Sequence, residues 1–189
     1  MDKFLVHGGI SLNGSIAASG AKNSALPALA AALLTAEPVI LTQIPEVRDI
    51  RTMENLLAHS GASVSVEGDR VMIHAAELPH PEAPYDLVKT MRASSLVLGP
   101  LAARTGRARV SLPGGCAIGT RPIDLHIRGL EYLGARIRQE HGYIQAEAPD
   151  GLKGAQIHFD RITVTGTEDL MMAAVLARGE TVLENAARD

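Results

Sequence analysis

The stretch Gly61–Ala75, GASVSVEGDRVMIHA, returns 73 positions later as Gly134–Ala148, GARIRQEHGYIQAEA. Each version begins with Gly-Ala, alternates apolar and polar residues around a short polar turn, and ends in Ala. This alternation predicts two strands joined as a β-hairpin. Two related hairpins at a fixed spacing indicate a chain built from internal repeats.

The same offset continues on both sides of the hairpins, without a gap in the register. It pairs Pro27 with Pro100, Arg48 with Arg121, Ile50 with Ile123, Val71 with Ile144 and Ala75 with Ala148. One further step leads from Gly106 to Gly179, into a third copy. The copies span about 19–75, 92–148 and 165–189, and we expect the last helix and hairpin of the third copy to lie beyond Asp189.

Within the first copy, the residues predict a fixed order of elements. Asn23–Leu34 is rich in Ala and Leu and predicts a helix with Pro27 in its first turn. Val39–Thr42 is typical of a short strand, and Ile50–His59 has apolar residues at helical spacing before a capping Gly61. With a leading strand, each copy has the order β-α-β-α-β-β.

Three such units predict an α/β fold in which the most apolar helices are covered by sheets. The Pro-rich segment Leu78–Pro84 can continue neither a helix nor a central strand, so we interpret it as a linker within one domain. Equivalent loops of the three copies are expected to gather at one end of this pseudo-threefold body.

Composition excludes several classes of protein. With 46% hydrophobic and 21% charged residues, the chain has an ordinary globular balance. Its net charge of −3 and dispersed basic residues argue against a nucleic-acid partner. The longest apolar run, Ala25–Leu34, is too short to span a membrane, and the N-terminus lacks the pattern of a secretory signal, so we expect a cytoplasmic location without a membrane partner.

The first candidate site is the small-residue loop Ser19–Ser24, which leads into the first predicted helix. Backbone N–H groups at a helix start and the Lys22 ammonium could together bind a phosphate or carboxylate. The alternative is a helix capped by Asn23 with Lys22 in solvent. Arg92 stands at the copy-two counterpart of Ser19, and Thr163 opens the copy-three helix, so the three helix starts are expected to share a cleft.

The second candidate is Cys116, the one cysteine of the chain, in the loop Pro113–Pro122, PGGCAIGTRP. A glycine-rich loop is an unusual place for a structural cysteine, and Arg121 would favour the thiolate if it lies close in space. An inert free thiol is the alternative, and no disulfide is expected.

The remaining candidate side chains suggest no further site. Histidine spacing and a single cysteine predict no metal site, and no cofactor is expected. Asp124 and His126 are too close along a helix to favour a proton-transfer pair. Met171 and Met172 are interpreted as core residues.

Three groups of residues together resemble the signature segments of the UDP-N-acetylglucosamine enolpyruvyl transferases. These are Gly20–Pro27 (GAKNSALP), Met91–Ser94 (MRAS) and Pro113–Leu125 (PGGCAIGTRPIDL). The resemblance extends over essentially the whole chain, including Thr163–Glu168 and Glu184–Arg188. It implies the transfer of enolpyruvate from phosphoenolpyruvate to the 3-hydroxyl of UDP-N-acetylglucosamine, the first committed step of peptidoglycan synthesis.

The resemblance also implies roles for individual residues. Cys116 would protonate the enolpyruvate methylene and be the group that fosfomycin alkylates. Lys22, Asn23 and Arg121 would contact phosphoenolpyruvate. The UDP-sugar would be bound by Arg92, Arg121, Pro122, Ile123, Asp124 and Leu125, together with Arg161, Thr163 and Val164, whose segment varies most in the family.

The fold implied by the resemblance is an inside-out α/β barrel domain, one of two built from three repeats each. Residues 1–18 would form a strand segment of the other domain, and residues 19–189 one repeat-built domain with an incomplete third copy. The general base on the sugar hydroxyl belongs to the other half, so we expect no turnover by these 189 residues alone. The alternatives are a non-catalytic nucleotide-sugar-binding fragment and an enzyme like 5-enolpyruvylshikimate-3-phosphate synthase, and the incomplete copy predicts self-association.

Overall fold

The first copy of the repeat forms helices and a three-stranded sheet in the computed structural model, which describes residues 3–9, 11–89, 91–112 and 123–188. Its elements are α1 (Lys22–Ala31), the 3-10 helix η1 (Ala32–Leu34), β1 (Val39–Leu41), α2 (Arg48–Ser60), β2 (Ser63–Glu67) and β3 (Arg70–His74). β3 pairs antiparallel with both neighbours, in the order β1-β3-β2. The predicted helices, strand and hairpin of this copy are confirmed.

The second and third copies repeat this plan with a leading strand added. Copy two comprises β4 (Glu82–Ala83), α3 (Tyr85–Val88), the 3-10 helix η2 (Arg92–Val97), α4 (Leu98–Thr105), β5 (Arg107–Ser111), α5 (Asp124–Tyr132), β6 (Arg136–Glu140) and β7 (Tyr143–Glu147). Copy three contributes β8 (Gln156–His158), α6 (Val164–Val175) and β9 (Val182–Glu184). β4 pairs parallel with β5, and β8 pairs parallel with β9 in the same way.

Pairing within the sheets corrects the gap-free register inferred from the sequence. In copy two, Val110 of β5 pairs with Ile144. The copy-one counterpart of Ile144 is Val71, which pairs with Leu41 of β1. Leu41 and Val110 are only 69 positions apart, so β1 is displaced by four residues from the 73-residue offset. The cause is local: η1 prolongs the first helix, and Thr35–Pro38 connects it to β1, whereas Gly106 alone connects α4 to β5; a shorter connection to α2 restores the register.

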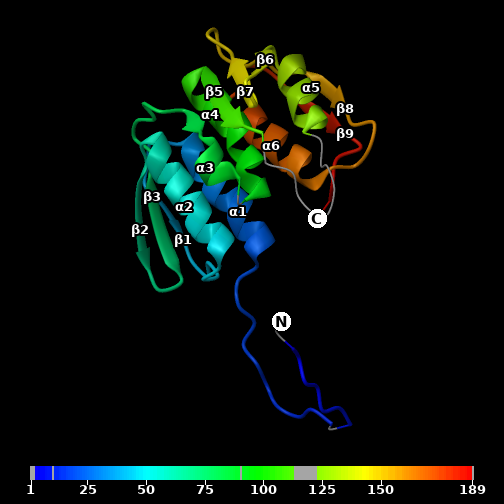
Figure 1. The fold of residues 1–189 in the computed structure, drawn as a ribbon. Coiled ribbons are helices and arrows are strands. Elements are labelled where there is room, and N and C mark those ends of the chain that lie inside the picture. The colour runs from blue at the N-terminus through cyan, green and yellow to red at the C-terminus, as the bar shows by residue number, and fades with distance from the viewer. Residues whose placement is uncertain (1–2, 10, 90, 113–122, 189) are drawn as a thin grey trace.

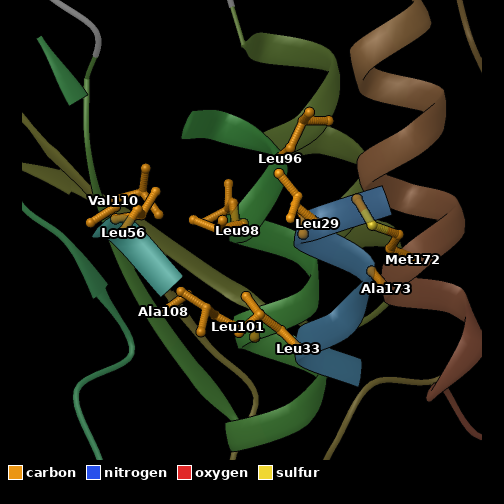
Figure 2. Packing of buried hydrophobic residues seen from close by; sticks show 14 of the residues in the cluster. Leu29, Leu33, Leu56, Leu96, Leu98, Leu101, Ala108, Val110, Met172 and Ala173 are labelled. Carbon is orange, nitrogen blue, oxygen red and sulfur yellow. The ribbon is translucent and has the colours of Figure 1, made fainter. Parts of the chain in front are cut away.

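The centre of the molecule is formed by α1, α4 and α6, one helix from each copy, with the sheets around them (Figure 1). η1 contacts α4 while α1 contacts η2, so the helices of the first two copies run in the same direction. Figure 2 shows Leu29 beside Leu96, and Leu33 beside Leu101 one layer further along; all four are fully buried. Each buried leucine stabilises the fold by about 1.5–3 kcal/mol, which makes this helix cluster the main hydrophobic core.

α2 covers one side of this centre, and its sequence accounts for its ends and its orientation. Ile50, Met53, Leu56 and Leu57 lie on one face of the helix and are buried, as their spacing predicts. Gly61 ends the helix with a φ of 114°, a left-handed conformation that glycine adopts readily.

The N-terminal tail stands apart from the core. Residues 3–9 and 11–20 form no helix or strand, and in Figure 1 they run away from the start of α1. Phe4 is 99% exposed and Leu12 is 98% exposed. Copy one therefore lacks, among its described residues, the leading strand that β4 and β8 provide in the other copies. The placement of residues 1–18 in another domain stays a prediction.

Three details differ from the sequence-based expectations. Pro27 lies in the interior of α1 rather than in its first turn, because the helix already begins at Lys22. Met171 is 54% exposed, so of the methionine pair only Met172 is a core residue. The segment Leu78–Pro84 contains the two-residue strand β4, at the edge of its sheet, where neighbouring prolines interrupt no ladder.

The close approach of α4 and α6 requires Gly99, which gives a first prediction. A Cβ atom at this position would lie 2.5 Å from the Asp169 backbone oxygen and 2.8 Å from Asp169 Oδ1. We expect Gly99→Ala to lower the free energy of unfolding by about 2 kcal/mol or more, measured by urea denaturation, because the two helices must separate. Gly8→Ala is the control, since its Cβ would meet no atom within 4 Å; equal stability of both variants would contradict the close contact.

Candidate helix-start site

The start of α1 is fixed by contact with the connection between β1 and α2. A Cβ atom on Gly20 would lie 1.6 Å from the Gln43 carbonyl oxygen, so only glycine allows this approach. Gln43 itself has a φ of 59°. The next residue, Ile44, is buried and donates its N–H to the Asp69 carbonyl over 2.8 Å, which anchors the connection to the first hairpin.

Lys22 joins the starts of two helices. Its Nζ lies 2.8 Å from Oδ2 of Asp49 in the first turn of α2, and the two side chains are 45% and 32% exposed. Ala21 is the N-cap residue of α1 and no side chain caps the helix, so the alternative in which Asn23 caps the helix is wrong. Lys22 and Asn23 therefore present exposed polar groups at a helix start, where backbone N–H groups and the helix dipole favour an anion.

A second group of predicted residues meets where α5 begins. Arg161 donates to Oδ1 of Asp124 over 2.6 Å, and Arg128 donates to Oδ2 of Asp160 over 2.8 Å. Both ion pairs join α5 to the connection between β8 and α6. Leu125 is only 7% exposed and belongs to the core.

The third helix start is capped by its own side chain. Thr163 precedes α6, and its Oγ1 accepts the N–H of Gly166 over 3.2 Å. Val164 is 41% exposed and lies beside this cap. Ile123, by contrast, is partly buried against the core.

Several predicted residues lie outside the described part of the chain. They are Cys116, Arg121, Pro122 and the side chain of Arg92. η2, which begins at Arg92, contacts both α1 and α6. The starts of the three central helices are thus neighbours, as the repeat predicts, while a shared cleft stays a prediction.

Sequence reasoning missed a buried polar cluster behind this surface. Asp169 of α6 is fully buried, and its Oδ2 lies 3.1 Å from Nδ1 of His126, which is 2% exposed. Oδ1 of Asp169 accepts the Gly99 N–H over 2.7 Å, and Nε2 of His126 lies 3.3 Å from Oγ1 of Thr165. One feature of the sequence could have indicated this cluster: Asp169 is an acidic residue directly before the apolar run Leu170–Val175 of a central helix.

A pocket lined by described residues lies elsewhere. It has a volume of about 670 Å³ and lies at the C-terminal end of α2, beside β5 and β7. Its polar lining residues are His59, His80, Glu82, Arg107, Arg109, Gln145 and Glu147. Asp49 is at the opposite end of α2 from His59, about 15 Å away along the helix, so this pocket does not include the helix starts.

Within the described part of the chain, shifted pKa values are found at Glu54 and Lys89, neither of which belongs to the helix starts. Burial raises the pKa of Glu54 in α2, against the opposing effect of the Arg51 guanidinium. The hydrogen bond to Asp86 raises the pKa of Lys89. Among the described residues, no group of three His, Cys, Asp or Glu side chains could hold a metal ion, and no helix is long and apolar enough to cross a membrane.

Comparison with known proteins gives extensive matches. A family model of EPSP synthase (3-phosphoshikimate 1-carboxyvinyltransferase) matches residues 6–189. Proteins called UDP-N-acetylglucosamine 1-carboxyvinyltransferase match the whole chain, with 72% identity over 189 residues in Solibacter usitatus and 65% over 193 residues in Acidobacterium capsulatum. The chain spans 45% and 44% of the lengths of these relatives.

Solved structures share the fold. The enolpyruvyl transferase NikO from Streptomyces tendae superposes with a TM-score of 0.77 and 23% identity, over 94% of this chain and 42% of that one. An EPSP synthase from Acinetobacter baumannii superposes with a TM-score of 0.74 and 21% identity, over 93% of this chain and 41% of that one. The predicted α/β fold class is therefore confirmed.

The Arg161–Asp124 pair gives a second prediction. Because the side chains are 56% and 44% exposed, we expect a double-mutant cycle of Arg161→Ala and Asp124→Ala to give a coupling energy below about 1 kcal/mol in urea denaturation. The pair then orients two side chains at the surface and adds little stability. A coupling energy above about 2 kcal/mol would show instead that the pair is a structural element of the fold.

Proposed function

Because its sequence matches the family model over residues 6–189, the chain belongs to the EPSP synthase family, and we propose that it is the N-terminal part of a UDP-N-acetylglucosamine 1-carboxyvinyltransferase. The observation that carries this proposal is the 72% identity, over the whole chain, to a relative with that name. The EPSP synthase structure shares only 21% identity, which favours the UDP-sugar enzyme over the shikimate enzyme.

The reaction proposed for the longer protein is an addition followed by an elimination. The 3-hydroxyl of UDP-N-acetylglucosamine gives its proton to a general base as its oxygen bonds to C2 of phosphoenolpyruvate, and the methylene carbon of phosphoenolpyruvate accepts a proton. Loss of inorganic phosphate and of a proton from that methyl group then restores the double bond. The product is enolpyruvyl-UDP-N-acetylglucosamine, and the step begins peptidoglycan synthesis and so cell-wall formation, in the cytoplasm.

Lys22 and Asn23 are proposed to bind phosphoenolpyruvate. The ammonium of Lys22 lies between two helix starts, α1 and α2, both of which favour an anion. Asp49 holds this ammonium in the ligand-free chain, so the substrate phosphate competes with a carboxylate for the same cation. Arg121 is proposed as a second cationic donor and Cys116 as the proton donor to the methylene carbon, the group that fosfomycin would alkylate.

The UDP-sugar is proposed to lie over the starts of α5 and α6. The residues assigned to it are Arg92, Arg121, Pro122, Ile123, Asp124, Leu125, Arg161, Thr163 and Val164. The contact between Asp124 and Arg161 supports this assignment, because it brings together residues 37 positions apart that were assigned to the same ligand.

Turnover is proposed to need the longer protein. The chain spans less than half of each relative, and the general base is assigned to the other half. For the 189 residues alone, the second candidate function is nucleotide-sugar binding without catalysis, which the exposed helix starts favour. Self-association of the chain is part of the same proposal.

Calorimetric titration of the 189-residue chain tests the proposal. We expect binding of UDP-N-acetylglucosamine, and binding of phosphoenolpyruvate that is weakened at least tenfold by Lys22→Ala, because a charge-assisted hydrogen bond is lost. Lys153→Ala is the matched control, since Lys153 is an exposed lysine far along the chain. Binding of shikimate 3-phosphate in place of the UDP-sugar would contradict the proposed substrate.

A further inference from the structure

The carboxylate of Asp169 is buried in a way that dictates its partners. It is fully buried in α6, and its Oδ1 accepts the backbone N–H of Gly99 in the first turn of α4 over 2.7 Å. A buried carboxylate is stable only when its remaining oxygen is also hydrogen-bonded. An ionised carboxylate accepts hydrogen bonds and donates none, so the group beside Oδ2 must bring a proton.

His126 of α5 supplies that proton. Its Nδ1 lies 3.1 Å from Oδ2 of Asp169, and its side chain is 3% exposed. Nδ1 therefore carries hydrogen and donates to Asp169. The hydrogen bond made by one ring nitrogen fixes which nitrogen carries the hydrogen. Asp169 therefore determines the state of Nε2 as well.

Nε2 is directed at the hydroxyl of Thr165, in the first turn of α6. The Nε2–Oγ1 distance is 3.3 Å. The Nδ1–Oδ2 distance of 3.1 Å is longer than the roughly 2.7–2.9 Å that is usual for a cationic donor and a carboxylate, which favours a neutral ring. A neutral ring with its hydrogen on Nδ1 presents a lone pair at Nε2, so the Thr165 hydroxyl donates inward to it.

We propose that Asp169 is a positioning residue that acts through His126 to turn the Thr165 O–H inward, so that this hydroxyl offers only lone pairs to a ligand. Thr165 is an exposed residue one position after Val164, at the surface assigned to the UDP-sugar. Lone pairs accept hydrogen bonds from sugar or ribose hydroxyls and repel phosphate oxygens. The ligand part of this inference rests on the proposed function; the state of the ring does not.

The variant Asp169→Asn separates this role from simple packing. An amide has nearly the same size as the carboxylate but only one acceptor oxygen. Gly99 N–H and His126 Nδ1–H then compete for this oxygen. We expect the oxygen to keep Gly99 and the amide NH₂ to face Nδ1, which moves the ring hydrogen to Nε2 and reverses the Thr165 hydroxyl.

Nitrogen-15 NMR of the histidine rings at neutral pH measures this directly. We expect wild-type His126 to show the Nδ1–H tautomer and Asp169→Asn the Nε2–H tautomer, with the His126 signal identified by its loss in His126→Gln. Asp160→Asn is the control, because Asp160 is an exposed aspartate paired with Arg128, and it should leave the ring unchanged. A protonated or Nε2–H ring in the wild type, or an unchanged ring in Asp169→Asn, would overturn the relay.

Binding of UDP-N-acetylglucosamine then tests the link to the ligand. We expect Thr165→Val and Asp169→Asn each to weaken binding about fivefold to tenfold, as for a lost or reversed hydrogen bond. Ser65→Ala, which removes an exposed hydroxyl from the first hairpin, should change binding less than twofold.

The outcomes separate the two proposals. Unchanged affinity in Asp169→Asn, together with an altered ring, would overturn the positioning role and leave a structural clamp between helices. A wild-type chain that binds no UDP-sugar would contradict the proposed function of the isolated chain and remove the ligand part of this inference, while the ring signal still decides whether the relay exists.

Discussion

The structure depends on the close packing of α1, α4 and α6, because each copy of the repeat buries its most apolar helix against the other two. Fully buried residues from all three copies, such as Leu29, Leu98 and Leu170, form this contact. The sheet of one copy alone would leave part of the apolar surface of its central helix exposed to water. The helix starts are therefore neighbours for a reason of packing, and a ligand surface at that end follows from the same arrangement that stabilises the core.

The sequence predicted the repeats, the helices and the hairpins because these depend on local periodicity. The ends of α2 follow from its apolar spacing and Gly61. Displacement of β1 was not predictable, since the 3-10 turn and the longer connection that follows it add residues without changing the apolar pattern. The contact between His126 and Asp169 could not be predicted either, because it joins residues 43 positions apart through helix packing. Lys22 was predicted as a cation at the start of the first helix, whereas its pairing with Asp49 depends on how α1 and α2 pack and could not be predicted.

Two of the described cations at the helix starts are already paired with carboxylates before any ligand arrives. Lys22 and Arg161, two of the proposed ligand-binding cations, each contact a carboxylate, Asp49 and Asp124 respectively. An anionic substrate must therefore replace an internal partner, which reduces the net gain from each new ion pair. Discrimination between one ligand and another then depends on groups of fixed orientation, such as capped helix starts and hydroxyls held by buried partners.

The described tail, residues 3–9 and 11–20, also affects the thermal unfolding of the chain. Its apolar side chains, Phe4 and Ile16 among them, are already in contact with water in the folded chain. Unfolding exposes almost no additional apolar surface there, and the heat capacity of unfolding increases with newly exposed apolar surface. By calorimetry the molecule would therefore behave as a smaller cooperative unit than its number of residues suggests.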